Sequence, residues 1–452
     1  MAISGIQPQG NVVEGSSART SIDDAAEYLI SQIADTGFMP ASSQYSFYSP
    51  HWFRDSSFCA IALLEYAEHY YDAPDTKLAT EAALAARRIN LFNCKAIELY
   101  VPNMRLAVKL ATDDPAMLQL ASHVPARVDA NGNIFHSENL RAAAGETRTM
   151  SDRGELVKDT WLRQHDTLPL VLLSLETEHK ISGLDYRKSE FLGRHSRLLA
   201  NYLGKIYTVP SANAWEINMR WIHAYDVAAI HRAFGTLRYF SRAGALSISE
   251  GEIEENTAAY NNGTGKGPIG FLKRHVVGDT LYSDRMPAGE PDLQYGVDSE
   301  QMFIFTRFGI GDKEIGEGVT SATMERIYRD RFCGNVLPSR FVNDWYYCGG
   351  RWLLLGLEYA RYLAQNGSID RAERIINYVV GKYGNSLPEQ ELIDPENPHN
   401  EVGQEYLKDN GGVPIQKLAW SYGALLSAHV SVEKAKAAPP ACRLIGKPAR
   451  TA

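Results

Sequence analysis

The 452-residue sequence contains few cysteines and no long apolar run. Its five cysteines are scattered and odd in number, and no two have the spacing of metal ligands, which argues against a disulfide framework. No apolar stretch reaches the ~18 residues that a transmembrane helix needs. We therefore expect reduced thiols, no bound metal and no membrane partner.

The sequence also lacks a basic excess and a start resembling a secretory signal. It has 46 Lys and Arg against 54 Asp and Glu, a formal net charge of −8, which argues against nucleic acid as a main partner because phosphate binding needs a basic surface. The first residues have neither a basic region nor an apolar core. We therefore expect a cytoplasmic protein, in which the sequons at Asn262 and Asn366 are coincidental.

Neither a linker nor a repeat of fixed period divides the chain. We expect a disordered, Gly- and Ser-rich start over 1–20, a single domain over 21–433 and a C-terminal tail over 434–452. Apolar residues make up 44% of the sequence and charged residues 22%, an ordinary globular composition that can build a large core.

Helical periodicity is abundant in this chain. Apolar residues recur at three- and four-residue spacing in about a dozen segments, and alternation is confined to 131–139 and 273–283, which predict short hairpins. The clearest helical segments are 21–35, 57–71, 76–95, 167–181, 190–207, 218–242, 299–308, 317–331, 350–366, 368–383 and 414–432. The pattern predicts an all-α domain with long loops at 124–160 and 244–298, where sites tend to lie.

Aromatic rings gather beside charged side chains at two expected helix starts. Tyr48 and Trp52 come just before Arg54 and Asp55, and the stretch 340–354 reads RFVNDWYYCGGRWLL. Sugar C–H faces stack on rings, and sugar hydroxyls pair with charged groups. The alternative is equally simple: an aspartate favoured by a helix start, and an aromatic-rich helix entry packed in the core.

Two glutamates stand out as candidate acid and base groups. Glu216 follows Trp215 just before an expected helix, and Glu389 follows a proline in the carboxylate-rich stretch 384–404. Crowded carboxylates are usually solvated, but they can also acquire perturbed pKa values and do acid–base work. The apolar segment around Trp420 is more typical of a core helix than of a ligand platform.

In their order along the chain these motifs resemble glycoside hydrolase family 15, the glucoamylase-like enzymes. The similarity rests on YSPHWFRDSS, on AWE before a helix, on RFVNDWYYCGGRWLL, and on LPEQ followed by LAWSYGALLSA. WLRQHDTLPLVLLSLE is also similar to a family segment with an Arg–Asp element before a helix. The motifs span residues 48 to 428. The resemblance implies an (α/α)6 barrel, six inner helices ringed by six outer ones, with loops and a few short hairpins forming an active-site funnel.

The resemblance also implies roles for individual residues. Glu216 would be the general acid and Glu389 the general base of an inverting hydrolysis. Sugar binding would fall to Tyr48, Trp52, Arg54, Asp55, Trp215, Arg340, Tyr346 and Trp420. Arg54 and Asp55 would grip the terminal glucose. The family needs no metal and no cofactor, and we expect a monomer whose partner is a small oligosaccharide.

One departure from the family leaves the substrate open. Many starch-acting members carry a second glutamate directly after the acid, where this sequence has Ile217. We expect an exo-acting α-glucosidase that releases β-glucose from short oligosaccharides, with α-1,6 links of the isomaltose type favoured. An α-1,4 glucoamylase, a trehalase on the same fold, and a non-catalytic glucan-binding or regulatory protein stay open. An unrelated α-barrel lyase is disfavoured, because no metal cluster or Tyr/His pair stands out.

Overall fold

A computed structural model describes residues 15–44, 48–71, 76–113, 118, 123–134, 164–183, 190–215, 221–258, 267–285, 289, 291–293, 296–341, 344, 350–392 and 413–438. The long helices are α1 (Gly15–Ser31), α2 (Phe53–Tyr70), α3 (Thr76–Glu98), α4 (Val101–Asp113), α6 (Thr167–Ser182), α7 (Glu190–Ile206), α8 (Ala224–Arg242), α14 (Leu353–Gln365), α15 (Ile369–Tyr383) and α17 (Ala419–Ala437). The shorter ones are α9 (Glu250–Ala258), α10 (Gly267–Leu272), α11 (Gln301–Thr306), α12 (Asp312–Ile315) and α13 (Val319–Ile327), with a 3₁₀ turn at Lys273–His275 and a π turn at Tyr328–Phe332.

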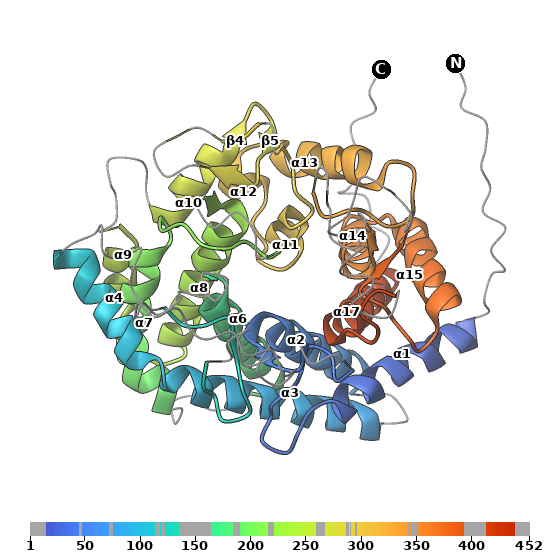
Figure 1. Ribbon diagram of the computed structural model, residues 1–452, viewed down its shortest axis with the longest axis horizontal. Coiled ribbons are helices and arrows are strands. Elements are labelled where there is room, and N and C mark those ends of the chain that lie inside the picture. Colours follow the sequence, from blue (N-terminus) through green and yellow to red (C-terminus); the bar gives the residue numbers. More distant parts are fainter. Residues whose placement is uncertain are drawn as a thin grey trace, which may run out of the picture.

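Within the described residues, six helices form a closed inner ring (Figure 1). α2 packs on α6, α6 on α8, α8 on α11, α11 on α14 and α14 on α17, and α17 returns to α2. The helices α1, α3, α7 and α15 lie outside this ring, and α3 packs against both α2 and α6. The double ring is an (α/α)6 barrel, so the all-α fold expected from the sequence is confirmed.

The distribution of apolar residues explains which helices lie inside. The first ten residues of α6, Thr167–Glu176, are buried, because leucine and valine occupy every face of the helix. The outer helix α15 buries a single stripe, Ala372, Ile375, Ile376, Val379 and Val380, at helical spacing. A helix that is apolar all round must be surrounded, whereas an amphipathic helix covers a core from one side.

The described residues include short strands, three of which lead into inner helices. They are β1 (His51–Trp52), β2 (Arg127–Val128), β3 (Ile222–His223), β4 (Val276–Val277), β5 (Thr280–Leu281), β6 (Asp284–Arg285), β7 (Arg351–Trp352) and β8 (Gln390–Glu391). β1, β3 and β7 run directly into α2, α8 and α14, and each pairs antiparallel with a strand from another loop: β2, β6 and β8. The pairing fixes these loops against the N-terminal ends of the inner helices.

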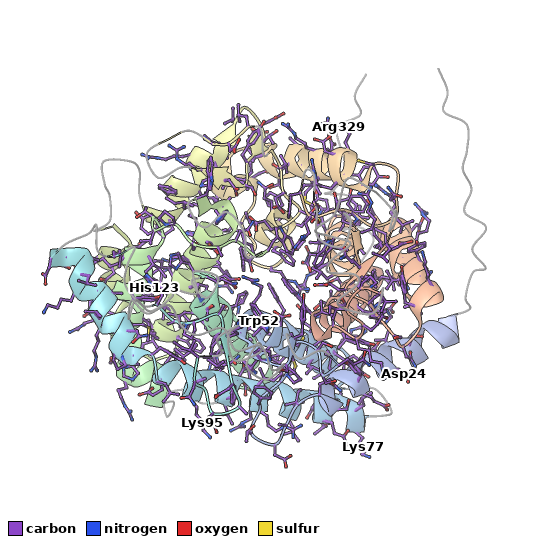
Figure 2. All side chains as sticks on the ribbon, viewed as in Figure 1. Asp24, Trp52, Lys77, Lys95, His123 and Arg329 are labelled. Carbon is purple, nitrogen blue, oxygen red and sulfur yellow. The ribbon has the colours of Figure 1, made fainter. Side chains whose placement is uncertain are left out.

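The N-terminal ends of three inner helices meet at one carboxylate. Asp166, the N-cap residue of α6, accepts hydrogen bonds from Arg54 at 2.6 Å and from Tyr225 at 3.0 Å. Arg54 lies in the first turn of α2 and Tyr225 in the first turn of α8. The neighbouring helices α2, α6 and α8 therefore start at the same end of the ring, where Trp52 lies near the middle of the view in Figure 2.

The structure corrects several boundaries expected from the sequence. α1 begins at Gly15, within the stretch 1–20 for which disorder was expected. α17 continues to Ala437, beyond the expected limit of the domain at 433, because Lys434 and Lys436 pair with acidic side chains and alanine and lysine favour helix. The hairpin at 273–283 is confirmed as β4 and β5. The region 244–298 is more than loop, since α9 and α10 lie in it.

Some expectations meet the limits of the described residues. Val128 forms a bridge to Ile134, which agrees with a hairpin starting near residue 131, but residues 135–139 lie outside the described part. α4 was not expected, because Pro102 looks like a helix breaker in the sequence. In the structure it lies in the first turn of the helix, where proline is tolerated. None of the described helices combines the length and apolar character needed to cross a membrane.

Candidate functional site

The first turn of α2 carries three of the residues expected to bind sugar. Trp52 is the N-cap residue of the helix, and Arg54 and Asp55 lie in its first turn. All three side chains are buried. The ring of Trp52 packs under the guanidinium of Arg127, 5.0 Å from its centroid, because β1 and β2 place the two residues opposite each other. A carboxylate at the position of Asp55 is favoured by the helix dipole.

Arg54 connects α2 to two other segments. Its Nε donates to Asp166 Oδ2 at 2.6 Å, its Nη1 donates to the carbonyl oxygen of Ala214 at 2.6 Å, and its Nη2 donates to Gln164. Charge-assisted bonds in this forked geometry are strong. Arg54 therefore fixes the start of α6 and the backbone two residues before Glu216, besides any contact that it makes with a sugar.

Arg340 lies among aromatic rings. Its guanidinium is 4.5 Å from the ring centroid of Trp352 and 5.7 Å from that of Trp215, and the two indole rings are 5.8 Å apart. Arg340 also donates to both carboxylate oxygens of Asp344, at 2.9 and 2.7 Å. Cation–π contacts and a bidentate ion pair together hold the buried guanidinium in one orientation.

Glu389 is a buried carboxylate, 3% exposed, at the same end of the barrel. The hydroxyl of Tyr48 donates to its Oε1 at 3.2 Å. Its backbone is fixed on both sides: the amide donates to Ile415 at 2.7 Å, and the carbonyl accepts from Leu353 at 3.3 Å. Glu389 is thus anchored between the start of α14 and the segment that enters α17.

Trp352 joins the two halves of the expected site. It pairs with Gln390 in β7 and β8, directly after Glu389, and its ring contacts that of Trp215. The structure therefore brings together residues from distant parts of the sequence that the resemblance had assigned to one pocket.

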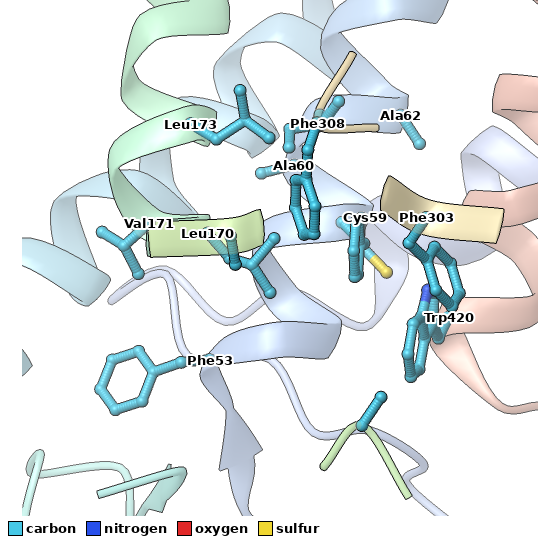
Figure 3. Close-up of a cluster of buried hydrophobic side chains, with 14 of the residues drawn as sticks. Phe53, Cys59, Ala60, Ala62, Leu170, Val171, Leu173, Phe303, Phe308 and Trp420 are labelled. Atoms are coloured by element: carbon cyan, nitrogen blue, oxygen red, sulfur yellow. The ribbon is translucent and has the colours of Figure 1, made fainter. Parts of the chain in front are cut away.

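Trp420 lies in the core, and two further expected residues are not described. Trp420 stacks on Phe58 at 5.2 Å and Phe303 at 5.6 Å between ring centroids, inside the core between α2, α11 and α17 (Figure 3). This placement agrees with a core helix, and a sugar-binding role for Trp420 stays a prediction. Glu216 and Tyr346 lie outside the described residues, so the structure places only their neighbours, such as Trp215 and Asp344.

Sequence reasoning missed a cluster of buried acids beside Trp215. Its members are Asp226 in the first turn of α8, Asp284 in β6, and Asp298 and Glu300 just before α11. An acidic residue at the start of an inner helix could have pointed to these positions, because Asp55 and Asp166 also lie at the starts of inner helices. The pattern was overlooked because a lone acid at a helix start has an ordinary explanation.

The acid cluster surrounds one histidine. His223 Nδ1 lies 2.8 Å from Asp284 Oδ1, and Nε2 lies 3.0 Å from the carbonyl oxygen of Ser211. A backbone carbonyl can only accept, so Nε2 donates to Ser211. Burial disfavours the charged ring, but the charge and hydrogen bond of Asp284 outweigh burial and raise the pKa of His223. Burial, together with the charge of Asp166, raises the pKa of Asp226 to about 7.

His223, Asp284 and Glu300 form a compact buried group. One ligand atom each from His223, Asp284 and Glu300 lie within 4.8 Å of one another. Nε2 of His223 lies against the carbonyl oxygen of Ser211 and Nδ1 faces Asp284, so within the described part of the chain these side chains belong to a buried hydrogen-bonded network.

Comparisons with known proteins place this architecture among solved structures. A wild-type glycosidase aligns with a TM-score of 0.70 at 18% identity, over 95% of this chain and 99% of its own. A glycosidase variant in complex with glucose aligns with a TM-score of 0.69 at 19% identity, over the same shares. Hormoconis resinae glucoamylase aligns with a TM-score of 0.57 at 13% identity, over 93% of this chain and 74% of its own. No protein-family model and no curated protein sequence matched. At these identities the similarities show the fold.

Proposed function

We propose that the protein is a glycoside hydrolase that acts on short α-glucosyl oligosaccharides from the non-reducing end. The observation that carries the proposal is the setting of Glu389, a buried carboxylate that receives the Tyr48 hydroxyl beside Trp352. Trp352 packs against Trp215, the residue before Glu216. Glu216 and Glu389 are the two carboxyl groups that we assign as the acid and base that glycoside hydrolysis needs.

The proposed reaction inverts the anomeric carbon. Glu216 protonates the glycosidic oxygen, which is otherwise a poor leaving group, and Glu389 takes a proton from the attacking water. The water needs room opposite the leaving group, so the two carboxyl groups should stand roughly 6.5–9.5 Å apart. The first product of an α-linked substrate is then β-glucose.

Aromatic and charged groups around Glu389 support a sugar as the ligand. The buried Nε1 of Trp52 has no hydrogen-bond partner among the described residues, so it is a donor available to a hydroxyl group. Arg340 supplies a positive charge beside the ring of Trp352, and Asp55 supplies a negative charge in the first turn of α2. A similarly folded glycosidase variant was solved with glucose, which supports glucose in particular.

We further propose isomaltose-type α-1,6 links as the preferred substrate. Ile217 offers no acceptor where starch-acting relatives offer a carboxylate, which should weaken the maltose-type pose by about 1–3 kcal/mol. A methylene in the α-1,6 link lets the second sugar occupy a different part of the funnel. The expected monomeric state and cytoplasmic location stay predictions.

Glucose release from isomaltose, maltose, nigerose and trehalose tests the function, with the anomer followed by proton NMR. The wild type should release β-glucose from at least one of them, and Glu389→Gln should lose ~10²–10⁴-fold in rate. Glu391→Gln is the matched control, because this nearby carboxylate binds Tyr378 and should leave the rate unchanged. Oligosaccharide binding without glucose release would instead indicate a non-catalytic glucan-binding protein, and initial α-glucose would overturn inversion.

A further inference from the structure

The two residues before Glu216 are held by hydrogen bonds from three directions. The carbonyl oxygen of Ala214 accepts from Arg54 at 2.6 Å, and its amide donates to Glu300 Oε2 at 3.2 Å. The indole Nε1 of Trp215 donates to Asp298 Oδ1 at 2.7 Å. Hydrogen bonds thus fix the backbone amide and carbonyl of Ala214 and the indole ring of Trp215.

The two carboxylates that hold this segment are themselves rigid. Asp298 Oδ1 also accepts the amide of Glu300 at 2.9 Å, and the amide of Asp298 donates to Gln301 Oε1 at 2.9 Å. The intervening Ser299 bonds through its amide to the carbonyl of Arg340 at 2.8 Å. Asp298 and Glu300 are 0% exposed. The turn that starts α11 is therefore a fixed platform under Ala214 and Trp215.

This arrangement is costly to build. Burial raises the pKa of Asp298 to about 7, although bonds from Glu300 and Trp215 oppose the shift. Burial and the charge of Asp298 also raise the pKa of Glu300. Placing two acids in a dry turn costs free energy that an apolar turn would not. Buried acids that lower stability in this way are expected near functional sites, where the position of a group matters more than stability.

We propose that Asp298 and Glu300 are positioning residues, which fix Ala214 and Trp215 and thereby aim the carboxyl group of Glu216 at the glycosidic oxygen. The inference rests on the proposed function, since it assigns to Glu216 the role of acid. Neither residue needs to touch the sugar. A displacement of about 1 Å at a reacting group can cost ~10²-fold in rate.

Comparing two substrates tests the inference. A disaccharide needs a proton on its leaving oxygen, whereas α-glucosyl fluoride has a leaving group that departs without much help from an acid. Asp298→Ala removes the acceptor for Trp215, and Trp215→Phe removes the donor but keeps an aromatic ring. Asp298→Ala should lose ~10–10²-fold in kcat/KM for the disaccharide that the wild type cleaves best, and less than ~3-fold for α-glucosyl fluoride. Trp215→Phe also alters a candidate sugar contact, which the fluoride reports, so its loss on the disaccharide should exceed its loss on the fluoride by ~10-fold or more.

Three further measurements separate positioning from general damage. Asp298→Asn keeps an acceptor oxygen, so it should recover most of the disaccharide rate that Asp298→Ala loses. The double variant should be no worse than either single variant, because both remove one interaction. Glu178→Ala is the control. Glu178 of α6 is also buried and accepts a hydrogen bond from Asn90 of α3 at 2.6 Å, so the rates on the two substrates should fall in parallel or not at all.

Each outcome has a distinct meaning. Equal losses on both substrates, unchanged rates, or additive losses in the double variant would overturn the positioning role while leaving the hydrolase intact. If Asp298→Ala does not fold, Trp215→Phe and Asp298→Asn still decide the matter. A wild-type protein that cleaves neither the disaccharides nor α-glucosyl fluoride would overturn the proposed function, and the inference with it.

Discussion

Arg54 and Asp55 are neighbours in the first turn of α2 but have different surroundings. Arg54 is bound by Asp166, Gln164 and the carbonyl of Ala214, so its loss would disturb several segments at once. Asp55 is a buried acid at a position where the helix dipole alone is worth at most ~2 kcal/mol. Of the two, Asp55 gives the cleaner test of sugar binding.

We expect Asp55→Asn to fold and to be severely impaired. Asparagine keeps the size of the side chain but cannot form a charge-assisted bond to a sugar hydroxyl, so kcat/KM should fall by ~10²-fold or more while stability changes by less than ~2 kcal/mol. Steady-state kinetics and urea unfolding measure the two effects. Asp370→Asn makes the same change in the first turn of the outer helix α15 and should leave the rate unchanged. Full activity in Asp55→Asn would return Asp55 to a purely structural role.

At the scale of elements, the pairing of β7 with β8 holds Glu389 in place. Gly350 comes just before β7, and a Cβ atom built on it would lie 2.3 Å from Gln390 Oε1 and 2.9 Å from the carbonyl of Glu391. The glycine therefore allows a close approach of two strands that any side chain would push apart. The strand that would be displaced is continuous with Glu389.

Gly350→Ala should accordingly impair both stability and rate. We expect a loss of ~1–3 kcal/mol from the forced separation, and a fall in kcat because the base moves. Gly381→Ala is the matched control, since no atom lies within 4 Å of its added Cβ in the outer helix α15, and it should stabilise by up to ~1 kcal/mol. Similar effects of the two substitutions would show that the strand contact does not matter.

At the scale of the whole molecule, buried charges tie four of the six inner helices together. Arg307, directly after α11, donates to Glu358 of α14 at 2.7 Å and to Ser427 of α17 at 3.0 Å. Glu65 of α2 is bound by Arg361 of α14 at 2.8 and 2.9 Å. Burial would raise the pKa of Glu65, but the charges of Arg361 and Arg307 outweigh it and lower the pKa to about 2.

Breaking this network should destabilise the barrel strongly. Arg307→Met leaves the Glu358 charge buried without its cation, and removing one partner of a buried pair costs ~3–5 kcal/mol. Arg242→Met is the control, because the Arg242–Glu250 pair is exposed and worth less than ~1 kcal/mol. The free energy of unfolding in urea measures both. Comparable values for the two variants would mean that the inner ring is held by apolar packing alone.

The sequence by itself determined the helices and the order of the candidate motifs. Period and composition within α2, α6 and α15 depend on residues a few positions apart, so the pattern could be read directly. The resemblance likewise picked out Tyr48 and Glu389, which the structure brings into hydrogen-bond contact. The short polar helix α9 was not predicted, because Ile253 is the one fully buried apolar residue among the α9 residues whose burial is described.

Tertiary structure alone decided which polar groups meet. Arg54 reaches Asp166 across 112 positions, and Trp215 reaches Asp298 across 83. Nothing local distinguishes Asp298 from an ordinary acid before a helix. These contacts exist because the inner ring closes and brings helix starts to one end, where burial makes each carboxylate depend on a particular donor. A one-dimensional pattern contains the residues, but the closure of the barrel selects their partners.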